Sequence, residues 1–527
     1  MSRPDWASRE RVLLTNGSIY APTELHPTAM LVDGDSIVWL GSDAVADSHR
    51  DAADRIIDLR GRLVTPGFVD AHVHATSTGL MLSGLDLTQT ASLREALDLI
   101  EARARHLRGG VMLGHGWDET RWPEGRPPTR QELDRATWGS VAYLSRVDVH
   151  SAAVSSALAA MVPGLGALPG FDPVGPLRRE AHHAVRETAL SSVTVGQRMA
   201  AQAVMRARCA ELGIVAIHEM AGPRISSEDD LAGLLALAAE VPGPLVSGYW
   251  GELARSGGIV TARRLGAVGV AGDLFVDGAI GSRTASLCHP YADAPDDSGA
   301  AYLDAADIAE HVVAATLAGL QAGFHVIGDA ASQAVIDGFE AAARDLGDEA
   351  IRSRGHRLEH VELLSDAQIA AMSRMGIVAS MQPMFDGLWG GRGGMYEQRL
   401  GAERASGMNR FADLAAAGVA TAFGSDAPVT ALGPWQAMSA AVLHSIPEQR
   451  ISTSAAFAAH TVAGWRAAAE PVAGVLAVGA PAHYVIWSVG VDSPTSGLPD
   501  LGQDVAIPQC ERTVVAGCTA FDSGMLD

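Results

Sequence analysis

The sequence has no lysine: each of the 39 basic residues in the 527-residue chain is an arginine. This absence excludes mechanisms that need a lysine Schiff base, a P-loop lysine or a carbamylated lysine. Cysteine is also rare. Cys209, Cys288, Cys510 and Cys518 have no paired C-x-x-C spacing, and they are too few to cross-link a chain of this length. They fit the reducing cytoplasm, where disulfides rarely persist.

Positive charge and long apolar runs are scarce as well. The chain has 61 acidic residues and a formal net charge of −22, and no basic patch offsets that charge. A field of this sign repels nucleic acid and anionic lipid. No apolar run approaches the roughly 18 residues of a transmembrane helix, and the opening MSRPDWASRERVLL lacks the apolar core of a signal peptide. We therefore expect a soluble, cytoplasmic protein that acts on a small molecule and binds neither nucleic acid nor membrane.

Apolar residues make up 48% of the chain and charged residues 19%, as in a folded protein with a large core. Both ends contain short β-rich runs, such as 12–14 and 484–487, with turn residues between them. The middle alternates strand-like runs with alanine-rich helical stretches, such as 306–322 and 330–346. This alternation is typical of parallel βα units. The sequence therefore predicts an α/β fold in which the two termini pair into one small β-sandwich domain.

Eight strand-like runs in the middle match the number that closes a (β/α)8 TIM barrel. A further stretch after the first run is rich in tryptophan and irregular, and we interpret it as an inserted cap. The predicted domains are a β-sandwich from 1–66 and 470–527, a barrel from 67–82 and 206–469, and an insertion at 83–205. The predicted barrel strands are 64–74, 214–220, 245–250, 274–278, 324–329, 357–362, 378–383 and 422–428.

The motif TPGFVDAHVHA (65–75) carries the strongest chemical signal. Residues two apart on a strand share a face, so His72 and His74 point the same way at the end of the first barrel strand. That end of a barrel carries the active site. Two imidazoles on one face suit a divalent metal of the zinc, iron or manganese kind. The alternative for a bare H-x-H pair is two polar residues at a strand end.

Three more residues of the same chemical kind stand at predicted strand ends. His325 lies in FHVIGDA (324–330), His360 in RLEHVE (357–362) and Asp426 in TAFGSDAP (421–428), after a Gly-Ser pair that permits close backbone approach. A single histidine in an apolar strand is usually a hydrogen-bonded core residue. Four histidines and an aspartate at the mouths of barrel strands instead predict a metal site.

These motifs resemble those of the amidohydrolase superfamily, and further ones resemble its amidohydrolase 3, or YtcJ-like, branch, which includes N-substituted formamide deformylases. The resemblance covers nearly the whole chain. It implies metal ligation by His72, His74, His325 and His360, with Asp426 beside the metal as general base. The motifs that carry it are LGHGWDETRW (113–122), LSRVDVHSAAVSSAL (144–158), LFVDGAIGSRTA (274–285), HVIGDAA (325–331), LEHVELL (358–364), SMQP (380–383) and GSDAPV (424–429).

One position departs from the pattern of these relatives. Many of them carry, just before the LFxDG motif, a lysine whose carboxylated form bridges two metals, and here that residue is Asp273. Either the site holds one metal or another carboxylate bridges. We favour Glu219, in AIHEMAGP (216–223), as the additional ligand, because the side chain of Asp273 is much shorter than the group that it replaces. The alternative for Glu219 is an outward-facing side chain paired with an arginine, since Glu219 and His218 cannot both face the barrel interior.

The predicted activity is hydrolysis of an amide or formamide-like C–N bond by metal-activated water, with zinc as the expected metal and one or two ions. Asp426 accepts the proton and passes it to the departing amine, while the metal and His360 polarise the carbonyl. The alternatives are a deaminase or cyclic-amide hydrolase with the same site, and a catalytically silent metal-binding relative with a regulatory role. The resemblance to the family, and no feature of the sequence itself, suggests a homodimer.

Five residues are predicted to read the substrate: Trp117, Asp118, His150, Arg283 and Gln382. The first three lie in insertion motifs that the family places near the pocket, and their alternative role is packing of the cap. Arg283 either holds a carboxylate or stabilises a turn, and we favour the turn. Gln382 stands before Pro383, where its amide can donate to a carbonyl oxygen.

Overall fold

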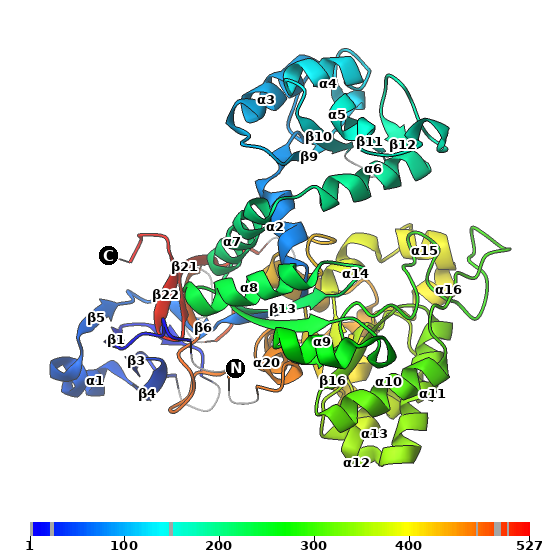
Figure 1. The fold of residues 1–527 in the computed structure, drawn as a ribbon. Coiled ribbons are helices and arrows are strands. Elements are labelled where there is room, and N and C mark those ends of the chain that lie inside the picture. Colours follow the sequence, from blue (N-terminus) through cyan, green and yellow to red (C-terminus); the bar gives the residue numbers. More distant parts are fainter. Residues whose placement is uncertain are drawn as a thin grey trace. The chain divides into compact units, whose positions relative to one another are not determined.

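The computed structural model describes residues 4–21, 26–146, 151–470, 473–489, 497–502 and 505–526. The chain forms two compact units, Met1–His74 with Arg206–Asp527, and Ala75–Met205 (Figure 1). Each unit has hydrophobic cores of its own.

Eight parallel strands form the central sheet of the first unit, in the spatial order β19-β18-β17-β16-β15-β14-β13-β7. The two edge strands meet, because Asp426 N–H donates to His72 O at 2.8 Å and His74 N–H donates to Ala427 O at 2.9 Å. These bonds close the sheet into a barrel, and the predicted (β/α)8 fold is confirmed. The strands are β7 (Phe68–Val73), β13 (Ile214–Ala221), β14 (Leu245–Trp250), β15 (Gly269–Val270), β16 (Gln321–Val326), β17 (Arg357–His360), β18 (Val378–Met381) and β19 (Thr421–Phe423).

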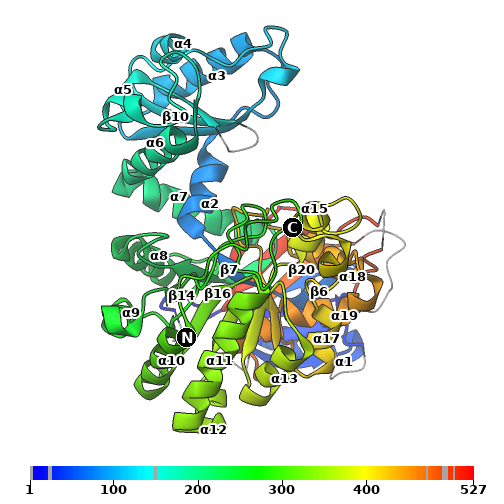
Figure 2. The same ribbon diagram turned by 90° about the vertical axis from the view of Figure 1, so that its right-hand side faces the viewer.

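Helices follow the barrel strands and cover the outside of the sheet (Figure 2). Side-chain caps mark several helix starts: the carboxylate of Asp304 accepts from the Ala306 and Asp307 amides, and Ser365 forms a capping box with Gln368. The helices are α8 (Glu228–Glu240), α9 (Gly258–Leu265), α10 (Ala305–Ala318), α11 (Asp329–Leu346), α12 (Asp348–Arg352), α13 (Asp366–Met375), α14 (Pro383–Trp389), α15 (Met395–Leu400), α16 (Ala402–Ala405), α17 (Phe411–Ala416), α18 (Pro434–Val442), α19 (Thr453–Ala459) and α20 (Val462–Ala467), with 3-10 turns at Ala254–Ser256 and Pro447–Gln449.

The first predicted barrel strand, 64–74, is in fact two strands that meet at Gly67. A Cβ at Gly67 would lie 2.2 Å from Val215 Cγ1, so only glycine fits this close passage. Before it, β6 (Leu63–Pro66) pairs with a strand from the other end of the chain. After it, β7 enters the barrel. The prediction merged two strands that belong to different sheets.

The fourth predicted strand, 274–278, was also wrong. The barrel uses β15 in its place, and the predicted run pairs with β16 through an isolated bridge between Phe275 and His325. The physical reason is Asp277, whose carboxylate accepts hydrogen bonds from the backbone amides of Ser286, Ile327 and Gly328 and so holds this run as a loop.

The predicted helix 306–322 ends earlier than expected. α10 stops at Ala318, because Gly319 takes a left-handed conformation with φ of 76° and caps the helix. The next residues turn directly into β16. The other predicted helix, 330–346, corresponds closely to α11.

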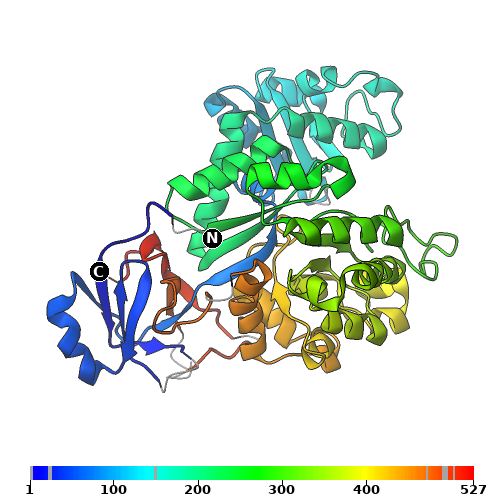
Figure 3. The ribbon, with the colours of Figure 1, turned by 60° about the horizontal axis from the view of Figure 1, so that its bottom comes forward.

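Strands from both ends of the chain form two further sheets, in the orders β4-β3-β1-β5 and β2-β6-β20-β21-β22. β6 and β20 pair antiparallel, with Pro66 opposite Tyr484, so N- and C-terminal strands lie side by side (Figure 3). Residues of both sheets, including Leu14, Met30 and Ile486, share one core, which confirms the sandwich. The elements are β1 (Arg11–Thr15), β2 (Ser18–Ile19), β3 (Ala29–Asp33), β4 (Ser36–Gly41), α1 (Asp43–Ala46), a 3-10 turn (Asp47–Ala52), β5 (Arg55–Asp58), β20 (Tyr484–Ser488), β21 (Gln509–Val515) and β22 (Cys518–Asp522).

The second unit is a five-stranded sheet of order β12-β11-β10-β9-β8 with helices on both faces. Alternate residues of β10 point to opposite cores: Leu144 packs with α3 and α4, and Tyr143 packs with α5 and α6. The predicted domain boundaries stay predictions. The elements are α2 (Ala75–Ser83), β8 (Leu85–Asp86), α3 (Leu93–His106), β9 (Val111–Trp117), α4 (Arg130–Ala136), β10 (Val141–Arg146), β11 (Ser151–Val154), α5 (Ser156–Ala160), β12 (Leu177–Arg178), α6 (Arg179–Ser191) and α7 (Val195–Glu211), with 3-10 turns at Glu119–Arg121 and Leu165–Ala167.

Among the described helices, we find none with the length and apolar character that crossing a bilayer requires. The cytoplasmic location stays a prediction.

Candidate metal centre

His72 and His74 turn their Nε2 atoms toward a common space at the carboxyl end of β7. His72 Nε2 lies 3.5 Å from Asp426 Oδ1, and His74 Nε2 lies 3.1 Å from the same oxygen. The two ring centroids are 5.4 Å apart. Alternation along the strand therefore brings both imidazoles to one face, and the segment after β19 supplies a carboxylate opposite them.

Two buried aspartates face these histidines. Asp426 follows β19 with φ of 53°, and its amide donates to the backbone oxygen of His72. Asp273 follows β15. Its Oδ2 lies 3.2 Å from His74 Nε2, and its Oδ1 lies 3.5 Å from His72 Nε2. The residue at the position of the missing lysine thus lies among the imidazoles.

His325 on β16 and His360 at the end of β17 complete the cluster. His325 Nδ1 lies 3.6 Å and His360 Nε2 lies 3.9 Å from Asp273 Oδ1. The second nitrogen of each ring contacts the protein: His360 Nδ1 is 2.7 Å from Gln382 Oε1, and His325 Nε2 is 3.3 Å from Gly278 O. These contacts place the proton of each neutral ring away from Asp273 and leave the inward nitrogen free to bind a cation.

The charges of the cluster depend on one another. Burial would raise the pKa of Asp273, but His72, His325, His360 and His74 hold it well below its usual value. Burial would likewise raise the pKa of Asp426, but His72, His74 and His360 lower it. Burial lowers the pKa of His360, whereas Asp273 and Asp426 raise it, for a net value of about 9. Both carboxylates are therefore ionised at neutral pH, whereas His360 carries an additional proton that a cation bound at its Nε2 would displace.

The donor set fits a divalent cation. Within the described residues, His72 Nε2, Asp273 Oδ1, His325 Nδ1 and Asp426 Oδ1 are buried without a hydrogen-bond partner. Leaving such atoms unpaired is unfavourable unless an ion satisfies them. Two ligand atoms on one zinc ion lie roughly 3–3.4 Å apart, close to the 3.1–3.9 Å found here. Two groups could each hold an ion: His72 with Asp273 and His360, and His72 with His74 and Asp426.

A buried ion pair, Arg357 with Glu359, contacts the Nδ1 side of His72. Glu359 Oε2 accepts a hydrogen bond from His72 Nδ1 at 2.9 Å, and Arg357 contacts both oxygens of Glu359, at 2.6 and 3.0 Å. The Arg357 guanidinium also reaches Ala71 O and His218 Nδ1. Burial alone would raise the pKa of Glu359, but Arg357 and His72 lower it to about 2. An ionised carboxylate thus fixes the orientation of His72.

A model of the amidohydrolase family matches residues 55–521. The chain belongs to the amidohydrolase family. The putative amidohydrolase YtcJ of Bacillus subtilis (strain 168) is 27% identical to this amidohydrolase over 418 residues, covering 73% of this chain and 74% of YtcJ. The N-substituted formamide deformylase of Arthrobacter pascens is 23% identical over 470 residues, covering 82% of this chain and 84% of its own. The predicted relation to this branch is confirmed.

A solved structure of an uncharacterized metal-dependent hydrolase from Pyrococcus furiosus has the same fold, with a TM-score of 0.76 and 27% sequence identity. The match covers 90% of this amidohydrolase and 98% of that chain. Together with the family match, this similarity identifies the protein as a metal-dependent hydrolase.

The other predicted residues of this amidohydrolase lie in different places. Glu219 is buried on β13 but belongs to neither group of possible ligands found in the described parts of the chain. Its neighbour His218 contacts Arg357. Arg283 makes two hydrogen bonds to the carboxylate of Asp293, at 3.0 and 2.7 Å, which is a contact within its loop. Gln382 holds His360 through its oxygen and has a buried Nε2 with no partner among the described residues.

The insertion residues lie in the second unit. Trp117 is buried in the core beside α3 and α4, and its Nε1 donates to Leu144 O at 2.8 Å. Asp118 pairs with Arg146, at 3.3 Å. His150 lies outside the described residues. These contacts agree with packing of the insertion, and the proposed substrate roles stay predictions.

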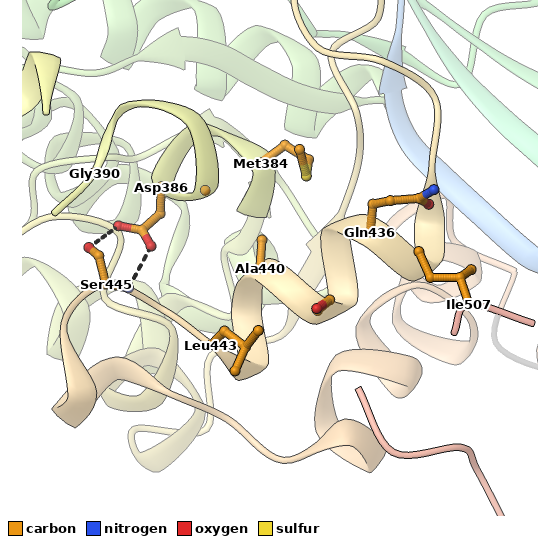
Figure 4. Close-up of a pocket in the computed structure, with 10 residues that line it drawn as sticks. Met384, Asp386, Gly390, Gln436, Ala440, Leu443, Ser445 and Ile507 are labelled. Carbon is orange, nitrogen blue, oxygen red and sulfur yellow. Dashed lines mark hydrogen bonds between the residues drawn. The ribbon is translucent and has the colours of Figure 1, made fainter. Parts of the chain in front are cut away.

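A separate pocket of about 420 Å³ lies between α14 and α18 (Figure 4). Its walls include Met384, Ala440 and Leu443, and Asp386 accepts hydrogen bonds from the amide and hydroxyl of Ser445 beside it. None of the described site residues lines this pocket. The neighbouring Phe385 instead stacks on His360, with ring centroids 5.9 Å apart.

Sequence reasoning missed Arg357 and Glu359 as parts of the site. Their signal was present in RLEHVE, since alternate residues of a strand share a face. The signal was obscured because adjacent residues of a regular strand point to opposite faces, so His360 and Glu359 are not expected on the same side. The φ of 72° at His360 instead turns its side chain toward the same space as that of Glu359. Glu362, buried just beyond the strand, was also missed; burial raises its pKa to about 6.

Proposed function

We propose that this amidohydrolase hydrolyses a C–N bond of a small N-substituted amide or formamide, with a divalent ion, expected to be zinc, held by His72, His74 and Asp426. The similarity to the Arthrobacter pascens deformylase supports the bond type. A small-molecule substrate suits a site built at the carboxyl end of barrel strands.

One observation carries the proposal. Buried nitrogen and oxygen atoms from β7, β16 and the ends of β15 and β19 meet without hydrogen-bond partners among the described residues. A purely structural cluster of imidazoles and carboxylates would satisfy these atoms by pairing them. A site that keeps them free and oriented suits an ion with an open position for water.

The chain's own residues would handle the protons. His72, His74 and Asp426 would hold the divalent ion, which would lower the pKa of a bound water to about 7. Asp426, ionised and 3.1 Å from His74 Nε2, is placed to accept a proton and then to deliver it to the departing amine. His360 donates to Gln382 through Nδ1, and because its pKa is about 9 it also carries a proton on Nε2, which can donate to a carbonyl oxygen and polarise it. The buried Gln382 Nε2 offers a further donor to that oxygen.

The test combines turnover with metal analysis. Protein purified without chelator is assayed on N-substituted formamides, simple amides, esters and cyclic imides. We expect release of amine and acid by the wild type, and a 10²–10⁴-fold lower kcat for Asp426→Asn, the usual range for loss of a general base. Asp522→Asn makes the same change in the terminal sandwich, where the carboxylate pairs with Arg512, and should leave kcat unchanged.

The products also separate the alternatives. Ammonia released from an amino-substituted ring would indicate a deaminase, and ring opening of a cyclic imide would indicate a cyclic-amide hydrolase with the same residues. Bound metal without turnover on the whole panel would favour a regulatory protein. Absence of bound metal from the wild type would contradict the proposal.

A further inference from the structure

We propose that α15 and α16, together with the loop 279–297 that they contact, form a lid beside His360, and that Tyr396 holds this lid closed. For the substrate that the lid would admit, the inference rests on the proposed function. The residues of the two helices lie between β18 and β19, and the proposed mechanism does not use them.

The proposed lid packs against the part of the barrel that carries His360. Tyr396 and Leu400 of α15 belong to one apolar cluster with Leu363 and Phe385. Leu363 follows His360 by three residues, and the ring of Phe385 stacks on the imidazole of His360. His360 is only 2% exposed. A substrate can therefore reach this imidazole only after neighbouring residues have moved.

The two helices and the loop form one body. The guanidinium of Arg404, in α16, donates to His289 O at 2.9 Å. The Ala292 amide donates to Arg399 O at 2.8 Å, and the guanidinium of Arg399, in α15, pairs with Asp293. Because these bonds join each helix to the loop, the three segments would move together.

A glycine-rich connection joins this body to α14, and there is space beside it. Gly391 and Gly393 both have φ of 76°, a conformation that favours glycine, and Arg392 between them is exposed. A pocket of about 190 Å³ separates the connection and Ala402 from Ile446. The glycines allow the chain to change direction here, and the pocket gives the lid room to move.

Tyr396 ties the lid to the barrel through a loose polar contact. Its hydroxyl, Glu362 Oε2 and Asn409 Nδ2 are buried, and none forms a hydrogen bond of ordinary geometry with a described residue. The hydroxyl nevertheless faces both side chains, because burial and Glu362 raise the pKa of Tyr396 whereas Asn409 lowers it. A hydroxyl can donate to a carboxylate and accept from an amide at once.

Such a contact holds the lid closed without fixing it. Buried polar groups that are incompletely paired weaken the closed state, and opening would let water reach them. This balance suits a lid that must open in every turnover. Replacing Tyr396 by phenylalanine keeps the ring but leaves the buried carboxyl of Glu362 without the hydroxyl that faces it, so the closed state should lose stability.

The test is limited digestion of the full-length, metal-loaded protein with trypsin, which cuts this lysine-free chain only after arginine. Cleavage after Arg392 reports the population in which the connection is open, and cleavage after Arg60, exposed in a turn of the sandwich, is the reference. For Tyr396→Phe we expect cleavage roughly 5-fold faster or more after Arg392, and unchanged after Arg60.

Tyr291→Phe is the matched control. Tyr291 lies in the same apolar cluster, but its hydroxyl donates to Ala285 O, at 2.9 Å, within the loop itself. This variant should be cleaved after Arg392 at the wild-type rate. Equal cleavage of the wild type and Tyr396→Phe, or equal acceleration by Tyr291→Phe, would overturn the lid.

Asn409→Asp guards against a folding defect in Tyr396→Phe. Asn409 has φ of 51°, which aspartate also tolerates, so the variant is expected to fold. It replaces the amide donor by a second carboxyl group facing Tyr396 and Glu362. Cleavage after Arg392 should again be faster than in the wild type, and an unchanged rate would count against the lid.

Turnover separates the lid from the proposed function. On an N-substituted formamide that the wild type hydrolyses, Tyr396→Phe should lower kcat/KM by a similar factor at unchanged metal content, because chemistry would occur under the closed lid. Unchanged kcat/KM despite faster cleavage would overturn the control of access. If the wild type hydrolyses the formamide and cleavage is equal, the lid fails and the hydrolase stands. If cleavage rises but the wild type hydrolyses nothing, the hydrolase fails and the lid stands.

Discussion

At the scale of single residues, the site depends on which nitrogen of each imidazole is occupied. His72 Nδ1 donates to Glu359, and His360 Nδ1 donates to Gln382, so the Nε2 atom of each ring faces the centre, where a cation can take the place of a proton. His325 shows the reverse pattern, with Nε2 held by a backbone oxygen and Nδ1 facing inward. Outer contacts of this kind typically fix both the tautomer and the ring orientation of metal-binding histidines.

Glu359→Gln should therefore weaken metal binding. The substitution removes the charge that holds His72 and leaves Arg357 without its anionic partner. We expect the dissociation constant for Zn²⁺ to rise 10–100-fold, the usual effect of losing an outer contact, with the same number of ions bound. Competition with a chromophoric chelator measures this constant.

The control for this variant is Glu511→Gln, which removes the charge from a partly buried pair with Arg62 in the terminal sandwich. It should lower stability without changing Zn²⁺ affinity. Loss of one partner from a buried ion pair costs about 3–5 kcal/mol, so Glu359→Gln itself is expected to lower the stability of the barrel. Glu359→Asp is a milder second variant, because its shorter side chain keeps a carboxylate for Arg357 but moves the oxygen away from His72. Wild-type affinity in both Glu359 variants would show that the contact only stabilises the barrel.

At the scale of elements, the centre exists because β7 and β19 approach closely. A Cβ on Gly424 would lie 2.5 Å from His72 N and 3.0 Å from Asp70 Oδ1. The carboxylate of Asp70 in turn accepts from the Ser425 amide at 2.8 Å. These contacts join the last barrel strand to the first, and the sequence signal for them was the Gly-Ser pair before Asp426.

Gly424→Ala should separate the two strands and disturb the centre. The added methyl group overlaps backbone, which cannot move aside as a flexible side chain does. We expect a loss of stability of roughly 1–3 kcal/mol and weaker metal binding, measured by urea unfolding and by chelator competition. Gly196→Ala, on α7 with open space around it, should change neither affinity nor stability by a comparable amount. Equal effects of the two substitutions would contradict this account.

The same elements show how far the sequence could predict the structure. Alternation in HVH placed His72 and His74 on one face, and the βα rhythm indicated the barrel. The fourth strand was misplaced because β15 has only two residues, too few for a periodic signal. The position of Asp273 among the imidazoles could not be predicted, because the course of its backbone at Gly272 depends on tertiary contacts that local patterns do not encode.

At the scale of the whole molecule, this acidic protein, with a net charge of −22, buries several histidines that are neutral in the folded state. His311 accepts from the Ala254 amide through Nδ1, and its Nε2 is 2.8 Å from Val270 O. His356 accepts from the Ala322 amide in the same way. Burial lowers the pKa of each well below 6.5, to about 4 for His311, about 3 for His356, about 4 for His460 and about 4 for His483.

Stability should therefore fall as the pH drops from 6.5 toward 4. In that window the unfolded chain binds protons at these histidines and the folded chain does not, so the free energy of unfolding rises with pH. Each histidine contributes a loss on the order of 2 kcal/mol between pH 6.5 and 5. Urea unfolding at several pH values measures the slope. His311→Asn and His356→Asn should each make the free energy of unfolding depend less steeply on pH. The control is His106→Asn, at an exposed position, which should leave this slope unchanged. An unchanged slope in both buried variants would rule out this source of acid sensitivity.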